Sequence, residues 1–271
     1  MAIGDIIVGI DIGTSKVSTV VGEVNNFKQI EIICNTSCKC NGIVKGQIID
    51  ADAISIAIAK TIKEAEEIAN FKISSAYITI PGKYTTIVQN SVVKETKSFD
   101  EISQKDIVSA IGAVKDIEMP EDEILIDIVP DKFILDDGKI VDNPIGSYSS
   151  TFTLMAQLIL ADKGYMKKIT SICKKAGIDI DGVVPVTLAE RNLVLDSNEL
   201  NDNVMILDIG AGNTEIGIFK GNTFIYNDTL PLGGDNITSD IAYVLNISKE
   251  EADKLKRQYG LALKSFIDND N

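Results

Sequence analysis

Apolar and polar residues alternate with a period of two in many short runs, which predicts a chain rich in β-strands. The first runs lie at 6–11, 17–24 and 29–40. The period then changes at 50–69, where apolar residues recur every three or four positions and predict a helix with Asp50 or Asp52 as its N-cap. A strand at 76–80 follows and ends at Pro81-Gly82, a strong break.

Residues 83–161 have an order of elements of their own. Their periodicity predicts a strand, a helix capped by Ser103 and three further strands, at 84–94, 103–116, 123–135, 139–141 and 149–160. Because this block separates a strand from a helix of the surrounding chain, we interpret it as an inserted α+β module. The run at 149–160 fits either an exposed edge strand, open for pairing, or a buried central strand.

The rest of the chain is predicted to contain helices and strands in the order helix, strand, helix, three strands and two helices. They are expected at 164–176, 178–184, 187–196, 204–209, 214–220, 223–230, 234–246 and 248–259. Gly177 is expected just past the end of the first of these helices. The complete order matches neither a Rossmann fold nor a TIM barrel.

One pattern occurs twice in the chain. The strand that ends in Asp11-Ile12-Gly13 and the strand that ends in Asp208-Ile209-Gly210 are each followed by small or hydroxylated residues and another strand. The two copies lie 197 positions apart. This repeat predicts two copies of one hairpin and hence an internally duplicated fold.

Composition limits which ligands and which catalytic groups the chain could have. The 271 residues include 40 acidic and 26 basic side chains, for a formal charge of −14, which argues against non-specific binding of nucleic acid or of an anionic membrane. The absence of histidine excludes a Ser-His-Asp or Cys-His nucleophile and a histidine-ligated metal. The N-terminus lacks the basic start of a secretory signal, and no apolar run is long enough to span a membrane. We therefore expect a cytoplasmic protein.

Four cysteines leave two interpretations open. Cys34, Cys38 and Cys40 cluster in the sequence and could hold zinc if Cys173 joined them in space. The favoured interpretation is structural, because Ile30, Ile32 and the three clustered cysteines all occupy even-numbered positions. On an extended strand they would all face the core.

The paired hairpins favour a phosphate ligand. Glycines in the turns let backbone N–H groups approach an anion, and neighbouring hydroxyl and amide side chains add neutral donors. The residues with these properties are Gly13, Thr14, Ser15, Gly210, Ala211, Gly212, Asn213 and Thr214. A single such turn is more often only a turn, but two copies on matching strands favour a clamp that holds a polyphosphate from both sides.

Charged residues flank the same turns. Lys16 adds a cation within reach of a β- or γ-phosphate. Asp11 and Asp208 come just before the turns, where carboxylates are suited to holding the hydration shell of Mg²⁺.

The paired hairpins resemble the phosphate-1 and phosphate-2 loops of the superfamily of actin, sugar kinases and heat-shock chaperone ATPases. Within it, the chain is most similar to the FtsA family of bacterial actin-like cell-division proteins. Further segments carry the likeness in order along the chain, at 42–50, 77–82, 143–146, 231–234, 238–242 and 252–260. The resemblance implies an α/β, actin-like (ribonuclease H-like) duplicated fold. Its parts would be a first subdomain at 1–82 and 162–200, the inserted 1C-like module at 83–161, and a partial second domain at 201–271.

The resemblance also implies roles for residues near the end of the chain. Gly233 and Gly234 would lie near the nucleotide, at the start of a helix. Asp253 and Lys256 would face its ribose and base, although an exposed helix face is the alternative, and the family usually has Glu where Asp253 stands. The implied ligands are ATP and Mg²⁺.

The chain departs from the family pattern after 259–260. The later glycine-rich adenosine loop and the remaining strands of the second half are missing, so we expect an incomplete second half of marginal stability. The acidic residues 265–271 do not resemble the family's amphipathic membrane helix, and no direct membrane anchor is visible.

The resemblance implies an ATP-binding scaffold of the division ring that binds FtsZ and other division proteins and forms filaments. Self-association would involve residues 83–161, ATP turnover would be weak or absent, and the protein would reach the division site through its partners. One alternative is a related pilus-assembly actin homologue. Another is a sugar-kinase-type phosphotransferase, which needs a carboxylate base; the module offers Asp127, Asp131, Asp136, Asp137 and Asp142, none in a context that singles it out.

Overall fold

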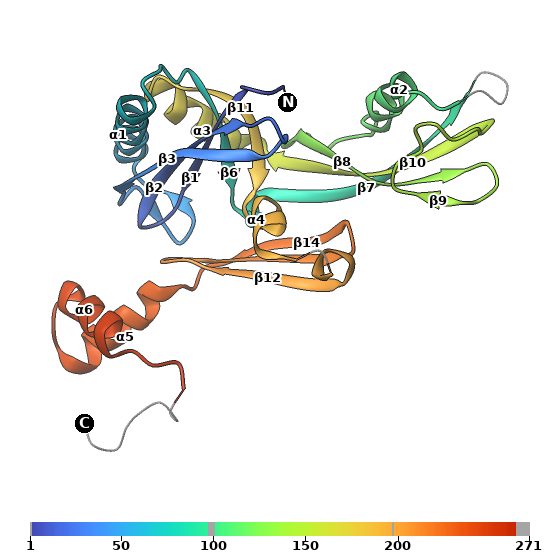
Figure 1. Cartoon of the computed structure of the whole chain (residues 1–271). Coiled ribbons are helices and arrows are strands. Elements are labelled where there is room, and N and C mark those ends of the chain that lie inside the picture. The colour runs from blue at the N-terminus through green and yellow to red at the C-terminus, as the bar shows by residue number, and fades with distance from the viewer. Residues whose placement is uncertain (1, 97–100, 197, 264–271) are drawn as a thin grey trace.

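The structure is a computed structural model that describes residues 2–96, 101–196 and 198–263. The acidic segment 265–271 lies outside the described residues. Three main sheets, each associated with helices, build the molecule (Figure 1). The expected helices and strands occur in the expected order along the described chain, and a short hairpin at 43–48 and two 3-10 helices were not expected.

The first sheet has five strands in the order β11-β6-β1-β2-β3. β1 pairs antiparallel with β2 and parallel with β6, and β11 is also parallel to β6. Helices α1 and α3 bury their apolar sides against it, together with isoleucines and valines of the central strands. The elements are β1 (Ile6–Ile12), β2 (Lys16–Val24), β3 (Ile30–Lys39), α1 (Ala51–Ala69), β6 (Ser75–Ile80), α3 (Lys163–Lys175) and β11 (Asp179–Pro185).

The ends of both helices follow the sequence prediction. Asp50 is the N-cap of α1, and its Oδ1 accepts hydrogen bonds from the N–H groups of Asp52 and Ala53, both at 3.0 Å. Asp52 lies in the first turn instead and pairs with Lys175 of α3 at 2.7 Å. Gly177 follows α3 with a positive φ of 85°, as expected for the residue after a helix end.

The expectation that Ile30, Ile32 and the clustered cysteines share one face was wrong in part. Cys34 and Cys40 are buried, but Ile30 and Ile32 are 52% and 58% exposed. The pairing of β2 with β3 shifts between Val21 and Gly22, so β3 has one extra residue and the side-chain alternation changes there. The zinc alternative also fails: among the described residues no group of three or more His, Cys, Asp or Glu side chains is arranged to hold a metal ion.

The inserted module is a four-stranded sheet, in the order β7-β10-β8-β9, with α2 packed on it (Figure 1). β10 pairs with β7 on one side and β8 on the other. Strand 149–160 is therefore central, and the edge interpretation was wrong. The elements are β7 (Thr85–Glu95), α2 (Gln104–Val114), β8 (Glu123–Leu135), β9 (Ile140–Val141) and β10 (Thr151–Asp162). Ser103 caps α2 as expected, in a capping box with Asp106.

The third sheet is an antiparallel meander in the order β12-β13-β14, and α4 lies between it and the first sheet (Figure 1). Two helices follow it and extend away from the sheets. These elements are α4 (Val186–Val194), β12 (Asn203–Ile209), β13 (Thr214–Lys220), β14 (Thr223–Leu230), α5 (Gly234–Leu245) and α6 (Lys249–Tyr259), with short 3-10 helices η1 (Gly82–Tyr84) and η2 (Glu199–Asn201). A small hairpin, β4 (Ile43–Val44) and β5 (Gln47–Ile48), turns at Lys45-Gly46.

Buried contacts join the module to the third sheet. Ile159 of β10 packs with Phe219 and Phe224, whose rings stack with centroids 4.6 Å apart. The Gln157 side chain, 1% exposed, accepts a hydrogen bond from the Phe224 N–H at 2.9 Å and donates to the Phe224 carbonyl. The module and the third sheet therefore share a core.

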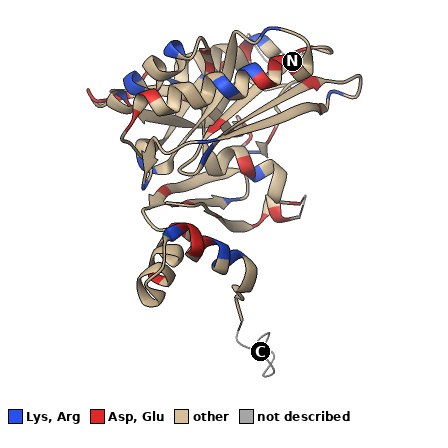
Figure 2. Cartoon of the chain, turned by 90° about the vertical axis from the view of Figure 1, so that its left-hand side faces the viewer, with Lys and Arg blue, Asp and Glu red and all other residues tan. Residues whose placement is uncertain are grey.

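The opposite face of the third sheet is largely apolar and exposed. Met205, Leu207 and Ile209 alternate along β12 with exposed fractions of 59%, 48% and 70%. Lys, Arg, Asp and Glu concentrate on the helices above and below this sheet rather than on its strands (Figure 2). In the described part of the chain, no helix has both the length and the apolar character needed to cross a membrane.

Candidate functional site

The two Asp-Ile-Gly hairpins have the same backbone geometry. Gly13 N–H donates to the Lys16 carbonyl at 3.0 Å, and Gly210 N–H donates to the Asn213 carbonyl at 2.9 Å. The last paired residues before the turn are also equivalent in the two copies: Ile12 pairs with Val17, and Ile209 pairs with Thr214. The predicted repeat of one hairpin is present in the structure, once at the end of β1 and once at the end of β12.

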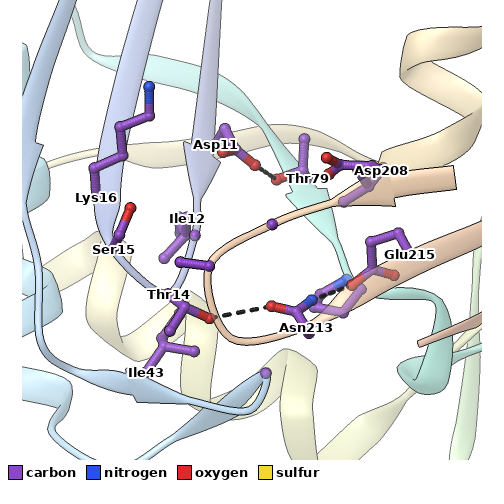
Figure 3. A pocket seen from close by; sticks show the side chains of 16 residues that line it. Asp11, Ile12, Thr14, Ser15, Lys16, Ile43, Thr79, Asp208, Asn213 and Glu215 are labelled. Carbon is purple, nitrogen blue, oxygen red and sulfur yellow. Dashed lines mark hydrogen bonds between the residues drawn. The ribbon is translucent and has the colours of Figure 1, made fainter. Parts of the chain in front are cut away.

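The tips of the two hairpins touch. A Cβ on Gly212 would lie 2.7 Å from the Thr14 Cγ2 atom, so only glycine allows this approach. The Thr14 hydroxyl donates a hydrogen bond to Asn213 Oδ1 at 3.1 Å, across 199 positions of sequence (Figure 3). The loops therefore face each other over one cleft.

Most of the residues predicted to bind phosphate, and both aspartates predicted to face Mg²⁺, line that cleft. They are Asp11, Gly13, Thr14, Ser15, Lys16, Asp208, Gly210, Ala211 and Asn213. Gly212 lines a neighbouring hollow with Thr14, and the Thr214 hydroxyl instead donates to the Leu232 carbonyl at 2.8 Å. The Lys16 ammonium points away from Asn213 (Figure 3).

Carboxylates gather on the opposite side of the cleft from Thr14 (Figure 3). Asp11 Oδ1 accepts the Thr79 hydroxyl at 2.8 Å. Burial, and then the charge of Asp11, raise the pKa of Asp208. Two acidic side chains that line one cleft, at the ends of β1 and β12, suit a hydrated Mg²⁺, which keeps several waters and binds few protein oxygens directly. The residues present therefore fit the implied Mg²⁺ ion.

Two further acidic residues belong to this region, and the sequence analysis missed both. Glu215 of β13 lines the cleft and is only 3% exposed. Glu190 of α4 has a raised pKa of about 7, because of burial first and then the charges of Asp208, Asp11 and Glu215. The sequence does hold a signal for Glu215. In the alternation of side chains along β13, Glu215 lies on the same face as Gly217 and Phe219, which is the buried face.

The predicted residues near the end of the chain are placed differently from one another. Gly233 packs against the second hairpin so closely that a Cβ would lie 2.5 Å from the Ala211 carbonyl oxygen. The Lys256 amine donates to the Gly234 carbonyl at 3.0 Å and pairs with Asp253, also at 3.0 Å. Asp253 and Lys256 thus hold α6 against α5 and do not line the cleft defined by the described residues.

Strands β1-β2-β3 and strands β12-β13-β14 form two antiparallel units of the same kind. The first hairpins of the two units face each other across a cleft, and a module is inserted into the first half of the chain. This arrangement defines an actin-like fold. Solved structures agree. The type IV pilus biogenesis complex PilM-PilN has a chain that aligns with a TM-score of 0.58 and 19% identity, covering 94% of this chain and 70% of that one. The ethanolamine utilization protein EutJ from Carboxydothermus hydrogenoformans aligns with a TM-score of 0.54 and 14% identity, over 94% and 62% of the two chains.

Sequence comparison gives the family. The family described as "Cell division protein FtsA" matches residues 205–271, and the "SHS2 domain inserted in FTSA" matches residues 82–160. The FtsA proteins of Buchnera aphidicola from Schizaphis graminum, Escherichia coli K12 and Bacillus subtilis 168 are 31%, 28% and 30% identical over 96%, 98% and 95% of this chain. The chain belongs to the FtsA family. It spans 62%, 63% and 59% of the length of these relatives.

Proposed function

We propose that this chain binds ATP with Mg²⁺ between its paired hairpins and works as an actin-like scaffold in cell division. The observation that supports this most directly is the contact of the two hairpin tips at Thr14, Gly212 and Asn213. Two turns with the same backbone geometry then offer N–H groups and hydroxyls to one ligand from two sides. A polyphosphate is the ligand that such a clamp fits.

In this proposal each hairpin has a distinct role. Gly13, Thr14 and Ser15 bind the phosphates from the first half, with Lys16 turning toward them, and the segment from Gly210 to Thr214 binds from the second half. Asp11 and Asp208 hold the water shell of Mg²⁺, which offsets the negative charge of the phosphates. Gly233 and Gly234 place the N-terminus of α5 next to the second hairpin, where the helix dipole favours an anion.

Partners are proposed from the family. We infer binding to FtsZ and other division proteins, self-association through residues 83–161, and a cytoplasmic location at the division site. The pilus-assembly alternative has only fold-level support, whereas the FtsA relatives match in sequence along the chain. The phosphotransferase alternative gains no support, because none of the module's five candidate aspartates is among the residues that line the described cleft. We propose at most weak ATP turnover.

The test is calorimetric titration of the chain with Mg-ATP. Gly212→Ala puts a methyl group where Thr14 stands, so we expect the two hairpins to move apart until they no longer reach the phosphates from both sides. Binding should then weaken about tenfold or more, the equivalent of one or two hydrogen bonds to the ligand. Gly112→Ala is the matched control, because a Cβ at Gly112 in α2 meets no atom within 4 Å.

Asp208→Ala should weaken binding in the presence of Mg²⁺ more than in its absence. A folded wild-type chain that binds no nucleotide, or equal affinities for Gly212→Ala and Gly112→Ala, would contradict the proposal. Folding of each variant is checked by circular dichroism and thermal unfolding.

A further inference from the structure

Glu215 is a buried carboxyl group at the centre of a hydrogen-bond network. Its Oε2 accepts the Gly82 N–H at 2.8 Å and the Thr229 hydroxyl at 2.7 Å. Its Oε1 accepts the Asn213 Nδ2 group at 2.5 Å. These three partners come from η1, β14 and the second hairpin, so Glu215 connects the hairpin to the segment that leads into the inserted module.

All three partners donate hydrogen bonds to this carboxyl group. An ionised carboxylate only accepts hydrogen bonds, so it suits this set of donors. The Thr229 hydroxyl accepts the Lys83 N–H at 3.0 Å and donates its own proton to Glu215.

The same logic fixes the amide of Asn213. A side-chain amide has one donating and one accepting end, which are exchanged by a half-turn. Because Glu215 takes the donating end, the accepting end, Oδ1, must face Thr14. The Thr14 hydroxyl therefore donates its single proton to Asn213.

We propose that Glu215 is a positioning residue that, through Asn213, sets the direction of the hydrogen bond between the two hairpins and so keeps the Thr14 proton engaged until a phosphate displaces Asn213. This inference rests on the proposed nucleotide site. Phosphate oxygens only accept hydrogen bonds, so Thr14 can donate to one only after releasing Asn213. The hairpin-to-hairpin bond and the ligand thus compete for one proton.

Glu215→Gln tests the direction. The Gln side chain keeps one oxygen for Gly82 and Thr229 but presents an amide to Asn213, so the Asn213 amide is expected to turn over. Its Nδ2 group then donates to Thr14, and the Thr14 proton becomes free for a phosphate. We expect Mg-ATP to bind about three- to tenfold more tightly, the equivalent of one net hydrogen bond.

A double-mutant cycle with Thr14→Val separates this effect from charge. Glu215→Gln also removes a negative charge near the phosphates, but a gain caused by that change alone would persist without the Thr14 hydroxyl. We expect the gain to disappear when both substitutions are combined. Thr229→Val, which loosens Glu215 but leaves its chemistry unchanged, should produce no gain.

A second measurement does not depend on nucleotide. The side-chain amide signals of Asn213 in a ¹⁵N–¹H NMR spectrum are assigned by their loss in Asn213→Ser. We expect both Glu215→Gln and Thr14→Val to shift these signals in the free protein, because each replaces a direct partner of the amide.

These outcomes separate the two proposals. If the wild-type chain binds no nucleotide but the Asn213 signals respond as expected, the proposed function fails and the hydrogen-bond network stands. Three results would overturn the role of Glu215. The first is weaker or unchanged Mg-ATP binding by Glu215→Gln, and the second is a gain that persists in the Thr14→Val background. The third is that the Asn213 signals do not shift in Thr14→Val.

Discussion

Glu190 is held in α4 with its Oε2 atom buried and without a hydrogen-bond partner among the described residues. Three other carboxyl groups, Asp208, Asp11 and Glu215, act on it electrostatically. Burial and this repulsion both disfavour its ionised form, and the pKa rises from 4.5 to about 7. The folded state therefore holds a proton on Glu190 over a pH range in which the unfolded chain has lost it.

This shift predicts a pH-dependent stability. The contribution of Glu190 is most favourable below about pH 4.5 and is lost as the pH rises to about 7, because the folded state binds more protons in that window. Glu190→Gln stays neutral, so we expect it to be roughly 1–2 kcal/mol more stable than the wild type at pH 8 and little different at pH 4.5.

Urea unfolding at both pH values measures the effect. Glu31→Gln, at an exposed carboxyl on β3, is the control and should show no such difference. An equal change at pH 4.5 and pH 8 would speak against an ionisation effect.

Single residues could be predicted where a turn of the backbone requires a particular residue at a repeated spacing. The turn glycines Gly13 and Gly210 could be identified because their spacing to Asp and to the next strand repeats. Glu190 and Glu215 were missed because their importance comes from burial against partners that are distant in sequence. A lone Glu in a helix or strand looks the same in sequence whether it faces water or a cleft.

At the scale of elements, Gln157 is the clearest tie between two parts of the fold. It sits in the middle of β10, and its amide pairs with both backbone groups of Phe224 at the start of β14. A buried amide in this position substitutes for a missing strand partner.

Gln157→Leu should therefore destabilise the chain. It leaves the buried N–H and carbonyl of Phe224 without these bonds, at an expected cost of about 2–4 kcal/mol. Gln89→Leu is a matched control, because Gln89 lies directly opposite on β7 with its side chain exposed. Chemical denaturation of both variants measures the difference, and equal losses would show that Gln157 has no special role.

The order of strands and helices could be predicted from periodicity, but their neighbours in the sheets could not. The run at 149–160 alternates like an edge strand, yet β10 is central because β7 and β8 both pair with it, one on each side. The extra residue in β3 likewise comes from the pairing with β2, which is a property of two strands together. The prediction from alternating positions failed in β3 because a bulge shifts the alternation of its side chains.

At the scale of the whole molecule, the exposed face of the third sheet stands out. Met205, Leu207 and Ile209 form an apolar stripe on β12, and Tyr243 and Val244 of α5 are 88% and 76% exposed. Contiguous apolar surface of this kind marks a place where other protein packs or where association occurs.

We expect this stripe to bind a hydrophobic fluorescent dye. Leu207→Lys places a charge at its centre and should reduce the fluorescence enhancement by about half, without lowering the melting temperature, because Leu207 is already half exposed. Ile56→Lys on α1, at a site that is 69% exposed, is the control. If both variants behaved alike, the stripe would not be the site of dye binding.

The module is attached at its base, where the chain passes from β6 through η1 into β7 and returns from β10 into α3. Figure 1 shows β7 and β10 leaving the first sheet at this end of the module. Gly82, at this attachment, donates to the same carboxylate that holds Asn213. β8 has 13 residues, so the sheet extends roughly 40 Å from that base. The near half of the module also packs on the third sheet through Gln157 and Ile159, so a rotation at the base carries the module and that sheet together. A rotation of about 5° at the base moves the far end, roughly 40 Å away, by ~3.5 Å, which is longer than a hydrogen bond.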